Sequence, residues 1–330
     1  MTTHLATRQT TALRRAAVRA TQAPSVHNTQ PWRLQLGDGA LRIFADRTRR
    51  LTVLDTTARQ LTISCGCALL NARVSLAADK IGVAISRMPD PAQPDLLAVL
   101  KTTGTLEQAD PLLGALDPVL ELRQTNRRRF ADDDVPAFVL DDLEAAAALE
   151  GAFLYVVRDP DRRQAVAALS QHADEIENLN PAYRAELRAW TTDSPGRRDG
   201  VPHLAVPHVD GTSEDEVPIR DYDTSGRGGL PPLTHSSKDQ CLVLLCTAGD
   251  SAAEWLRAGE ALERVLLEIT RHGFVASPLT QVTEVPSTRA RLRSELRLLG
   301  YPHILLRIGR AAVTPASRRR RLVDVLVEEN

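Results

Sequence analysis

Residues 23–32 read Ala-Pro-Ser-Val-His-Asn-Thr-Gln-Pro-Trp, and this stretch organises the rest of the chain. A helix-like stretch leads into it and a strand-like stretch leaves it. Proline fixes its own φ and biases the preceding residue away from the helix, so Ala23-Pro24 predicts the end of the helix. Gln30-Pro31 adds a second extended step. We therefore expect a rigid loop between a helix and a strand.

The side chains of this loop suit a polar, planar ligand. The loop displays Ser25, Asn28 and Gln30, and it carries an imidazole at His27. Carboxamides both donate and accept hydrogen bonds, so the loop fits a flat heterocycle with mixed donors and acceptors along its edge. The same residue types form ordinary turns, and a plain connection between helix and strand is the alternative interpretation.

A basic stretch at 123–128, Arg-Gln-Thr-Asn-Arg-Arg, is the second candidate site. Alternate residues of an extended backbone share a face, which groups Arg123, Thr125 and Arg127. Two guanidinium groups and a hydroxyl make a suitable phosphate cradle. The alternatives are a solvated strand edge and a nucleic-acid surface. A net charge of −1 and the lack of interleaved aromatic residues disfavour nucleic acid.

Composition limits the class of protein. The 330 residues allow two domains or one large one, and 43% hydrophobic with 25% charged residues is typical of globular soluble proteins. The N-terminus has no secretory pattern, and we expect no apolar run long enough to cross a bilayer. The sequence therefore predicts a cytoplasmic protein that has a small-molecule ligand and no membrane or nucleic-acid partner.

The cysteines and histidines do not indicate a metal site. Cys65, Cys67, Cys241 and Cys246 lack the spacing of metal ligands, and no histidine has a partner at such spacing. We expect buried free thiols and no metal. A glycine-rich dinucleotide motif and a Walker A run are also missing from the sequence, so neither a Rossmann fold nor a P-loop is supported.

Hydrophobic periodicity predicts an α+β fold. We expect a hairpin over 32–45 that turns at Gly37-Asp38-Gly39, and a buried strand at 153–157. Further strands are expected at 81–85, 96–100, 241–247 and 304–308. Helices are expected at 6–22, 60–79, 141–149, 160–190, 255–269 and 288–299.

Residues 191–237 are rich in glycine, proline and aspartate and show little periodicity. Loops of this length inside compact domains are usually functional lids or disordered segments. We interpret this stretch as a lid-like insertion. If it closes over a site, the apolar side chains Trp190, Val201, Pro202 and Val206 are expected to be buried.

Several motifs together resemble the nitroreductase family, in particular its Acg-like branch. They are the loop at 23–32, Thr-Asn-Arg-Arg at 125–128, Gly-Val-Pro at 200–202, Ser-Pro-Leu-Thr-Gln at 277–281 and Glu-Val-Pro at 284–286. The resemblance covers nearly the whole chain. It implies a nitroreductase fold, with antiparallel or mixed sheets flanked by helices, that binds FMN and takes electrons from NAD(P)H.

The resemblance also implies which residues bind the cofactor. The ring would lie against the loop at 23–32 and the loop at 277–281, and the phosphate would lie in the cradle at 123–128 and against the C-terminal arginines. A plain turn at 277–281 and a solvated charged tail at 318–321 are the alternatives, and the choice between Arg127 and Arg128 stays open. The implied residues are Pro24, Ser25, Asn28, Gln30, Arg123, Thr125, Asn126, Arg127, Arg128, Ser277, Pro278, Leu279, Thr280, Gln281, Arg319 and Arg320.

Nitroreductases are homodimers with two flavins at the subunit interface, and this chain resembles two such subunits fused and diverged. We expect a first half at 1–110, with the ring loop, and a second half at 118–330, with the phosphate cradle. The stretches at 65–69 and 258–262 are similar, and each is expected to open a helix. Each half lacks what the other has, which predicts one FMN per chain in a monomer.

Two functions follow from the resemblance. The first is an FMN-dependent NAD(P)H oxidoreductase that reduces nitroaromatic or quinone-like acceptors. No catalytic side chain can be assigned, because the flavin carries the chemistry. The alternative is a protein that stores or sequesters FMN beneath a closed lid.

Overall fold

The computed structural model describes residues 2–103, 111–209, 216–231 and 240–329. The helices are α1 (Thr2–Ala20), α2 (Arg59–Ala78), α3 (Pro111–Gly114), α4 (Ala137–Leu149), α5 (Pro160–Asn178), α6 (Pro181–Trp190), α7 (Ala252–Arg271), α8 (Gln281–Glu284) and α9 (Pro286–Glu295). The strands are β1 (Trp32–Gly37), β2 (Ala40–Ala45), β3 (Val83–Arg87), β4 (Leu96–Thr102), β5 (Phe153–Val156), β6 (Cys241–Thr247), β7 (Val275–Pro278), β8 (Tyr301–Gly309) and β9 (Leu326–Glu328).

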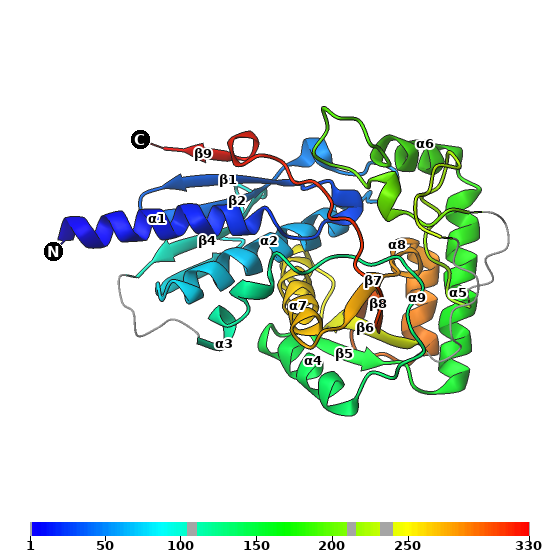
Figure 1. Ribbon diagram of the computed structural model, residues 1–330. Coiled ribbons are helices and arrows are strands. Elements are labelled where there is room, and N and C mark those ends of the chain that lie inside the picture. Colours follow the sequence, from blue (N-terminus) through cyan, green and yellow to red (C-terminus); the bar gives the residue numbers. More distant parts are fainter. Residues whose placement is uncertain (1, 104–110, 210–215, 232–239, 330) are drawn as a thin grey trace.

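Two sheets lie to either side of the central helices α2 and α7 (Figure 1). The first sheet has the order β3-β4-β2-β1-β9, and the second has the order β5-β6-β8-β7. Antiparallel pairing predominates, and β1 with β9 is the parallel pair, so the first sheet is mixed. The expected architecture of antiparallel and mixed sheets flanked by helices is confirmed.

The predicted hairpin at 32–45 is confirmed. β1 and β2 pair in antiparallel register from Trp32 with Ala45 to Gly37 with Ala40. Asp38 and Gly39 form the turn, and both have positive φ, at 52° and 68°. This is the conformation that matches the twist of a two-residue hairpin, and Asp-Gly is among the residue pairs that adopt it most readily.

The C-terminal segment links the two sheets. After β8 it runs back across the molecule, red in Figure 1, to the first sheet. There Leu326 of β9 pairs with Leu34 of β1. The residues between β8 and β9 therefore lie close to the loop at 23–32.

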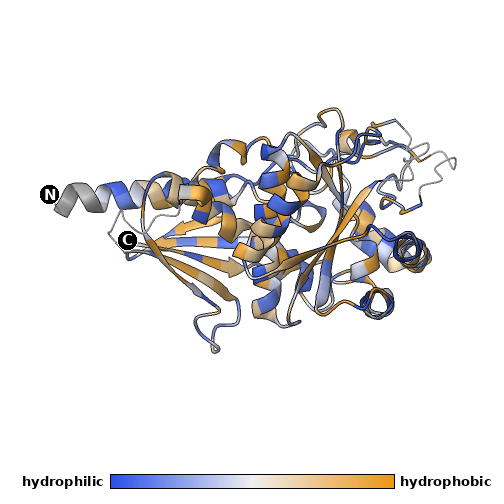
Figure 2. Cartoon of the chain, turned by 90° about the horizontal axis from the view of Figure 1, so that it is seen from below, coloured by the Kyte–Doolittle hydropathy of each residue, from blue (hydrophilic) through white to orange (hydrophobic). Residues whose placement is uncertain are grey.

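Helix α2 is the core of the molecule, and most of its residues are buried. Our expectation of no membrane-length apolar stretch was wrong for this helix, which is long and apolar enough by length and composition. However, 83% of its apolar window is buried inside the protein, which is typical of a core helix. Figure 2 shows apolar residues concentrated in the sheets and in the central helices.

Helices α2 and α7 cross at two glycines. A Cβ added to Gly66 would lie 2.1 Å from the carbonyl oxygen of Leu256 and 2.8 Å from Cα of Gly259. A Cβ added to Gly259 would lie 2.0 Å from the carbonyl oxygen of Ile63 and 2.8 Å from Cα of Gly66. The two contacts are equivalent, because Gly66 and Gly259 differ by 193 in residue number, and so do Ile63 and Leu256. The crossing therefore has local two-fold character.

Four details differ from the sequence-based expectations. The strand at 153–157 is not buried, because β5 is an edge strand with Phe153 37% exposed. The stretches at 65–69 and 258–262 do not open helices, since α2 begins at Arg59 and α7 at Ala252. The helical segment at 160–190 is two helices, divided at Asn180, which caps α6. Of the four apolar side chains expected to be buried, Val201 and Val206 are, whereas Trp190 and Pro202 are half-exposed.

Candidate functional site

The loop at 23–32 is a tight, backbone-constrained turn. His27, Asn28 and Gln30 have positive φ, at 46°, 54° and 51°. The side-chain oxygen of Ser25 accepts a hydrogen bond from the backbone nitrogen of Gln30 at 2.9 Å, which closes the turn. Non-glycine residues in this conformation cost on the order of 1–3 kcal/mol each, and such strain clusters at functional sites.

The carboxamide of Asn28 links three segments. Its Nδ2 donates to the carbonyl oxygens of Gly200 at 2.9 Å and Arg318 at 3.0 Å. Its Oδ1 accepts a hydrogen bond from Nη1 of Arg319 at 3.0 Å. The backbone adds a further link, from the nitrogen of Gly200 to the carbonyl oxygen of Asn28. Asn28 thus ties both the segment at 191–209 and the C-terminal tail to the loop.

Gln30 has a similar bracing position. Its Nε2 donates to the carbonyl oxygen of Arg198 at 2.9 Å, and its Oε1 accepts from the backbone nitrogen of Arg320 at 2.7 Å. It lines neither of the two cavities described below. Arg320 also lies outside them, with its guanidinium on the carbonyl oxygens of Gln30 and Asp324.

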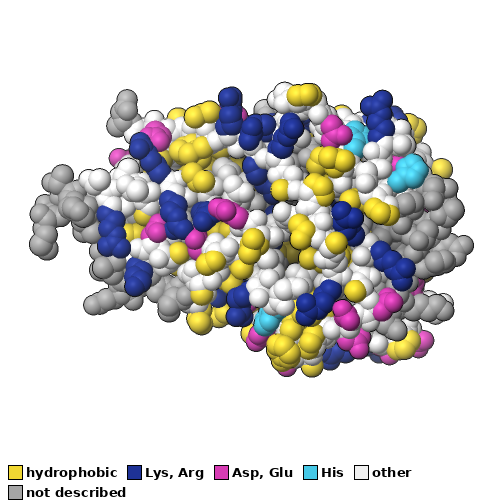
Figure 3. Space-filling view, viewed as in Figure 1, with side chains coloured by type: hydrophobic (Ala, Val, Ile, Leu, Met, Phe, Trp, Pro, Cys, Tyr) yellow, Lys and Arg dark blue, Asp and Glu magenta, His cyan; other side chains and the backbone are white. Residues whose placement is uncertain are grey.

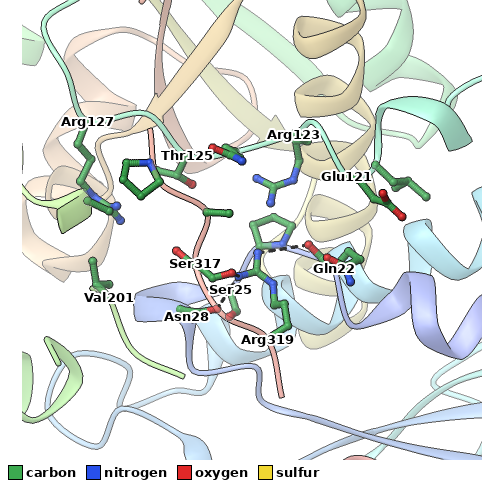
Figure 4. Close-up of a pocket in the computed structure, with 16 residues that line it drawn as sticks. Gln22, Ser25, Asn28, Glu121, Arg123, Thr125, Arg127, Val201, Ser317 and Arg319 are labelled. Carbon is green, nitrogen blue, oxygen red and sulfur yellow. Dashed lines mark hydrogen bonds between the residues drawn. The ribbon is translucent and has the colours of Figure 1, made fainter. Parts of the chain in front are cut away.

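The first cavity, here called the arginine cavity, opens between the loop, the basic stretch and the C-terminal tail. Figure 4 shows the guanidinium groups of Arg123 and Arg319 converging on it from opposite sides, with Arg127 further to the side. The space-filling view, seen from the side of Figure 1, shows a hollow near the middle with basic and hydrophobic side chains around it (Figure 3). The lining residues are Gln22, Pro24, Ser25, Asn28, Leu120, Glu121, Arg123, Gln124, Thr125, Arg127, Val201, Ala205, Pro315, Ala316, Ser317 and Arg319.

The three residues grouped by the predicted alternation lie at one cavity, but Gln124 between them lines it as well. Arg123, Thr125 and Arg127 line the arginine cavity together, beside β7, where Thr125 makes a parallel bridge with Ala276. Asn126 points elsewhere: its Nδ2 donates to the carbonyl oxygen of Ala312 at 2.8 Å.

Arg128 does not line the cavity either. Its backbone nitrogen donates to Oδ1 of Asn126 and its carbonyl oxygen accepts from Nη2 of Arg307. The geometry therefore favours Arg127 over Arg128 as the cavity-lining member of the pair.

Like charges crowd the arginine cavity. Burial, and then the neighbouring Arg123, lower the pKa of Arg319 to about 9. The buried counter-charge from the protein is Glu263 of α7, with Oε1 3.5 Å from Nε of Arg123. Glu121 also lines the cavity, but it pairs with Arg19. Neither Glu263 oxygen has a hydrogen-bond partner among the described residues. Burial raises the pKa of Glu263 to about 7, although Arg123 opposes the shift.

The second cavity, here called the apolar cavity, shares Pro24, Ser25, Thr125 and Arg127 with the first. Its walls come from the N-terminal half of α2, from α7, from the end of β7 and the turn after it, and from β8. The lining residues are Pro24, Ser25, Val26, His27, Gln60, Ile63, Ser64, Cys67, Thr125, Arg127, Tyr222, Leu262, Leu266, Pro278, Thr280 and Ile304. The two cavities are neighbouring parts of one site, with a cationic end and an apolar end.

His27 and Tyr222 close one side of the apolar cavity. Their rings meet edge to face with centroids 5.4 Å apart, and the guanidinium of Arg127 lies over Tyr222 at 4.7 Å. Burial, with Arg220 and Arg127 nearby, lowers the pKa of His27 well below its usual range, so its imidazole is neutral. Neither ring nitrogen has a hydrogen-bond partner among the described residues.

The loop at 277–281 contributes unevenly. Pro278 and Thr280 line the apolar cavity. Leu279 packs in a separate core cluster, Ser277 is buried within β7, and Nε2 of Gln281 donates to Asp174 at 2.6 Å. Two of the five predicted residues therefore reach the site.

Sequence reasoning missed several lining residues. Gln60, Ser64 and Cys67 lie one helical turn apart on α2 and face the apolar cavity, as do Leu262 and Leu266 on α7. The sequence predicts both helices as core helices. Residues at i, i+4 spacing share one helix face, but this spacing does not show whether that face packs in the core or lines a cavity. His27 also lines the apolar cavity, and its position within the loop at 23–32 could have identified it as a site residue.

The described residues contain no cluster of side chains suited to bind a metal ion. Among the described residues, no group of three or more histidine, cysteine, aspartate or glutamate side chains is arranged to hold an ion. The four cysteines are free thiols, of which Cys65, Cys67 and Cys246 are buried and Cys241 is partly exposed. Burial raises the pKa of the Cys246 thiol to about 12 and that of Cys241 to about 11.

Comparison with known proteins defines the family. A protein of Mycobacterium tuberculosis strain H37Rv named "Putative NAD(P)H nitroreductase Rv3131" is 32% identical over 334 residues, covering 99% of this chain and 93% of that protein. "Putative NAD(P)H nitroreductase acg" of the same strain is 30% identical over 328 residues, covering 96% of this chain and 95% of that protein. The chain belongs to the nitroreductase family of these relatives. No model of a known protein family matches it.

Solved structures give a weaker likeness. The FMN and NADPH-dependent nitroreductase NfnB of a Sphigopyxis strain superposes with a TM-score of 0.41 at 18% identity, covering 65% of this chain and 99% of that one. The FMN-dependent NfnB of Mycobacterium smegmatis, solved with NADPH, gives a TM-score of 0.37 at 20% identity, covering 61% and 89%. The site described above therefore stands on its own geometry.

Proposed function

We propose that the joined cavities bind FMN, with the phosphate in the arginine cavity and the ring in the apolar cavity. The observation that carries the proposal is the shared wall of Pro24, Ser25, Thr125 and Arg127, which makes the two cavities one elongated site. One end offers guanidinium groups and the other offers aliphatic walls. A flat heterocycle with a phosphate group likewise has an anionic end and a planar, largely apolar end, so it matches the two ends of the site.

The cationic end fits a phosphate. Arg123 and Arg319 face each other with Nε atoms that lack hydrogen-bond partners among the described residues, and a hydroxyl is present at Thr125. Arg123 is buried, Arg319 is half-buried, and Glu263 lies 3.5 Å from Arg123, so two cations share one buried carboxylate. A dianion between the guanidinium groups would complete this arrangement through charge-assisted hydrogen bonds.

The apolar end fits a planar ring. Ile63, Leu262, Leu266 and Ile304 supply aliphatic surface, and the unpartnered nitrogens of the neutral His27 supply a donor and an acceptor. FMN, when bound, supplies the hydride and electron transfer chemistry. The role of the chain is to hold the ring, exclude water and present hydrogen-bonding groups to the ring edge.

We further propose that the chain arose by duplication, with halves near 1–110 and 118–330, and that it holds one FMN. Gly66 of α2 and Gly259 of α7 are equivalent at the crossing, and their numbers differ by 193. By the same difference, Cys67 of α2 corresponds to Glu260 of α7, and Leu266 of α7 corresponds to Arg73 of α2. Where Cys67 and Leu266 line the apolar cavity, Glu260 and Arg73 form an ion pair at 2.7 Å. The equivalent second site is thus filled by protein.

The same proposal predicts a monomer. A homodimer interface of two flavin-binding halves is contained within one chain, so no symmetric partner is required. Sedimentation at micromolar concentration should give a single-chain mass. We also place the protein in the cytoplasm, in keeping with its free thiols.

We propose NAD(P)H as the electron donor and nitroaromatic or quinone-like compounds as acceptors. The names of the two relatives support this reaction class, although they specify no acceptor. One observation favours the alternative, in which the protein stores FMN. Val201 and Ala205 line the arginine cavity and Tyr222 lines the apolar cavity, so the insertion at 191–237 covers part of the site. The parts of this insertion at 210–215 and 232–237 lie outside the described residues.

The two functions are separated by mixing the FMN-loaded protein with NADPH in the absence of oxygen. An oxidoreductase should lose its flavin absorbance within ordinary turnover times, whereas a storage protein should respond only to dithionite. Tyr222→Ala, which shortens the side chain over the apolar cavity, should speed reduction if the insertion limits access. Leu204→Ala is the matched control, because Leu204 belongs to the same insertion but is 60% exposed.

A further inference from the structure

A third cavity lies on the other side of Gln60 from the apolar cavity. It has a volume of about 340 Å³ and is bordered by the N-terminal ends of α2 and α7, by α8 and α9, and by the start of β8. Gln60 lines both cavities, and its Nε2 has no hydrogen-bond partner among the described residues. This space is separate from the site assigned to FMN and is large enough for a small organic molecule.

Arg59 is the unusual residue of this cavity. It is 6% exposed, and one nitrogen, Nη2, donates to the carbonyl oxygen of Thr283. Its Nη1 has no hydrogen-bond partner, and no carboxylate lies within 4.0 Å of it in the described part of the chain. Burial, followed by the nearby Arg289, lowers the pKa of Arg59 to about 10. Glu284, Asp250 and Asp55 oppose this lowering of the pKa only in part. A buried guanidinium without a direct ion pair is costly, because its desolvation is not fully compensated.

The acidic side chains of the cavity are already engaged. Asp250 forms a two-pronged ion pair with Arg289, at 2.7 and 2.8 Å, and also accepts from Nε1 of Trp255. Asp55 accepts from the backbone nitrogens of Gln60 and Leu61, which caps the start of α2.

Glu284 is also engaged, although less completely. Its Oε2 pairs with the buried Arg220, and its Oε1 is the acceptor that stays unpartnered in the described residues. The uncommitted groups in this cavity are therefore mainly donors, which suits an anion.

The walls add aromatic surface. Trp255 and Tyr301 both line the cavity, and the guanidinium of Arg293 stacks over the ring of Tyr301 at 3.9 Å. An aromatic ring against these side chains would gain contact area and edge or stacking interactions. Stacking also fixes the Arg293 guanidinium as a second cation at the cavity wall.

We propose that this cavity binds a small aromatic carboxylate. The carboxylate would lie against Arg59 and Gln60 and complete the missing ion pair, while the ring would lie against Trp255 and Tyr301. Because Gln60 is shared, the ligand would occupy a position next to the proposed flavin ring without overlapping it. The inference does not depend on FMN, since it rests on Arg59 and on the cavity alone.

The experiment uses calorimetric titration of the purified full-length protein with benzoate. Benzamide, which has the same shape and no charge, is the matched ligand control. Benzoate should bind with saturation and benzamide should bind at least about tenfold more weakly, as expected for loss of a charge-assisted hydrogen bond. Equal binding of the two compounds, or no saturable benzoate binding at millimolar concentration, would overturn the proposal.

Arg59→Met separates a binding role from a structural one. Methionine preserves much of the side-chain volume and removes the unpaired charge, so the variant should keep or raise the thermal midpoint while benzoate binding weakens about ten- to a hundredfold. Arg291→Met is the control, because Arg291 is exposed on α9 and its one ion pair in the described part of the chain is with Glu295. A large loss of stability in Arg59→Met, or unchanged benzoate affinity, would show that Arg59 is structural.

Discussion

The two sides of the α2–α7 crossing have the same backbone arrangement and opposite contents. On one side Cys67 and Leu266 line the apolar cavity. On the other side the equivalent positions hold Glu260 and Arg73, which are joined in a buried ion pair. The same backbone crossing thus carries a cavity wall on one side and a buried ion pair on the other.

The filled side is a network and not a single pair. Arg73 also pairs with Glu150 at 2.5 Å, Arg87 pairs with Glu260 at 2.6 Å, and Arg264 pairs with Glu150 at 2.7 Å. Both carboxylates are thereby satisfied by two arginines each, which offsets the cost of burying them. The contrast with the open side lies in hydrogen bonding. Neither oxygen of Glu263 has a hydrogen-bond partner among the described residues, and the Nε atoms of Arg123 and Arg319 also lack one. An anionic cofactor would supply acceptors for such guanidinium groups.

The largest expected effect comes from breaking the crossing itself. Gly66→Ala and Gly259→Ala each place a Cβ about 2 Å from a backbone oxygen of the opposite helix, which the helix cannot avoid by moving a side chain. Each should cost about 3 kcal/mol of unfolding free energy, the upper end for overpacking. Because the contacts are equivalent, chemical denaturation should give similar losses. Gly196→Ala, with open space around it, is the control, and a loss in only one helix variant would contradict the two-fold crossing.

The next effect tests the open side. Arg123→Ala should weaken FMN binding by roughly 1.5–3 kcal/mol, because it removes a buried charge-assisted donor from the proposed phosphate end. Quenching of FMN fluorescence gives the affinity. Arg129→Ala serves as the matched control, since Arg129 follows in the same stretch but is exposed beside Asp132. Unchanged affinity in the first variant would mean that the phosphate lies elsewhere.

A smaller effect concerns Glu263 and pH. The raised pKa, near 7, means that the carboxyl is neutral below that pH and charged above it. A phosphate dianion nearby would raise this pKa further, so FMN binding would take up a proton. Affinity should then fall above pH 7, by at most about tenfold per pH unit.

The Glu263 carboxyl also determines the direction in which the stability of the folded protein changes with pH. Its pKa is higher in the folded than in the unfolded protein, so the folded state binds more protons between about pH 4.5 and 7. Stability of the FMN-free protein should therefore fall as pH rises through this window. Glu263→Gln should flatten both profiles, whereas a variant that keeps the wild-type pH dependence of FMN binding would exclude this role for Glu263.

Much of the fold could be predicted from the sequence. Period-two alternation and Asp-Gly fixed the hairpin at 32–45, and helical spacing of Leu262, Leu266 and Ile269 located α7. The exposed edge strand at Phe153 could not be distinguished from a central strand, because a short apolar run reads the same in both positions. Helix boundaries were uncertain by several residues for similar reasons.

The parts of the site formed by residues close together in the sequence could be predicted. The parts formed by packing between distant segments could not. Alternation placed Arg123, Thr125 and Arg127 on one face, and the structure places all three at one cavity. The bracing roles of Asn28 and Gln30 depend on segments about 170 and 290 residues away, which no local pattern reveals. The filled second site likewise depends on which side chains meet across two helices.

The central claim is that one side of the crossing binds FMN and the other side is closed. Titration of cofactor-free protein with FMN, followed by separation and absorbance measurement of the bound flavin, tests it most directly. We predict saturation at one FMN per chain, together with loss of that single site in the Arg123→Ala variant at sub-saturating FMN. Saturation at two FMN per chain would contradict the account, because it would require the position of Glu260 and Arg73 to be open.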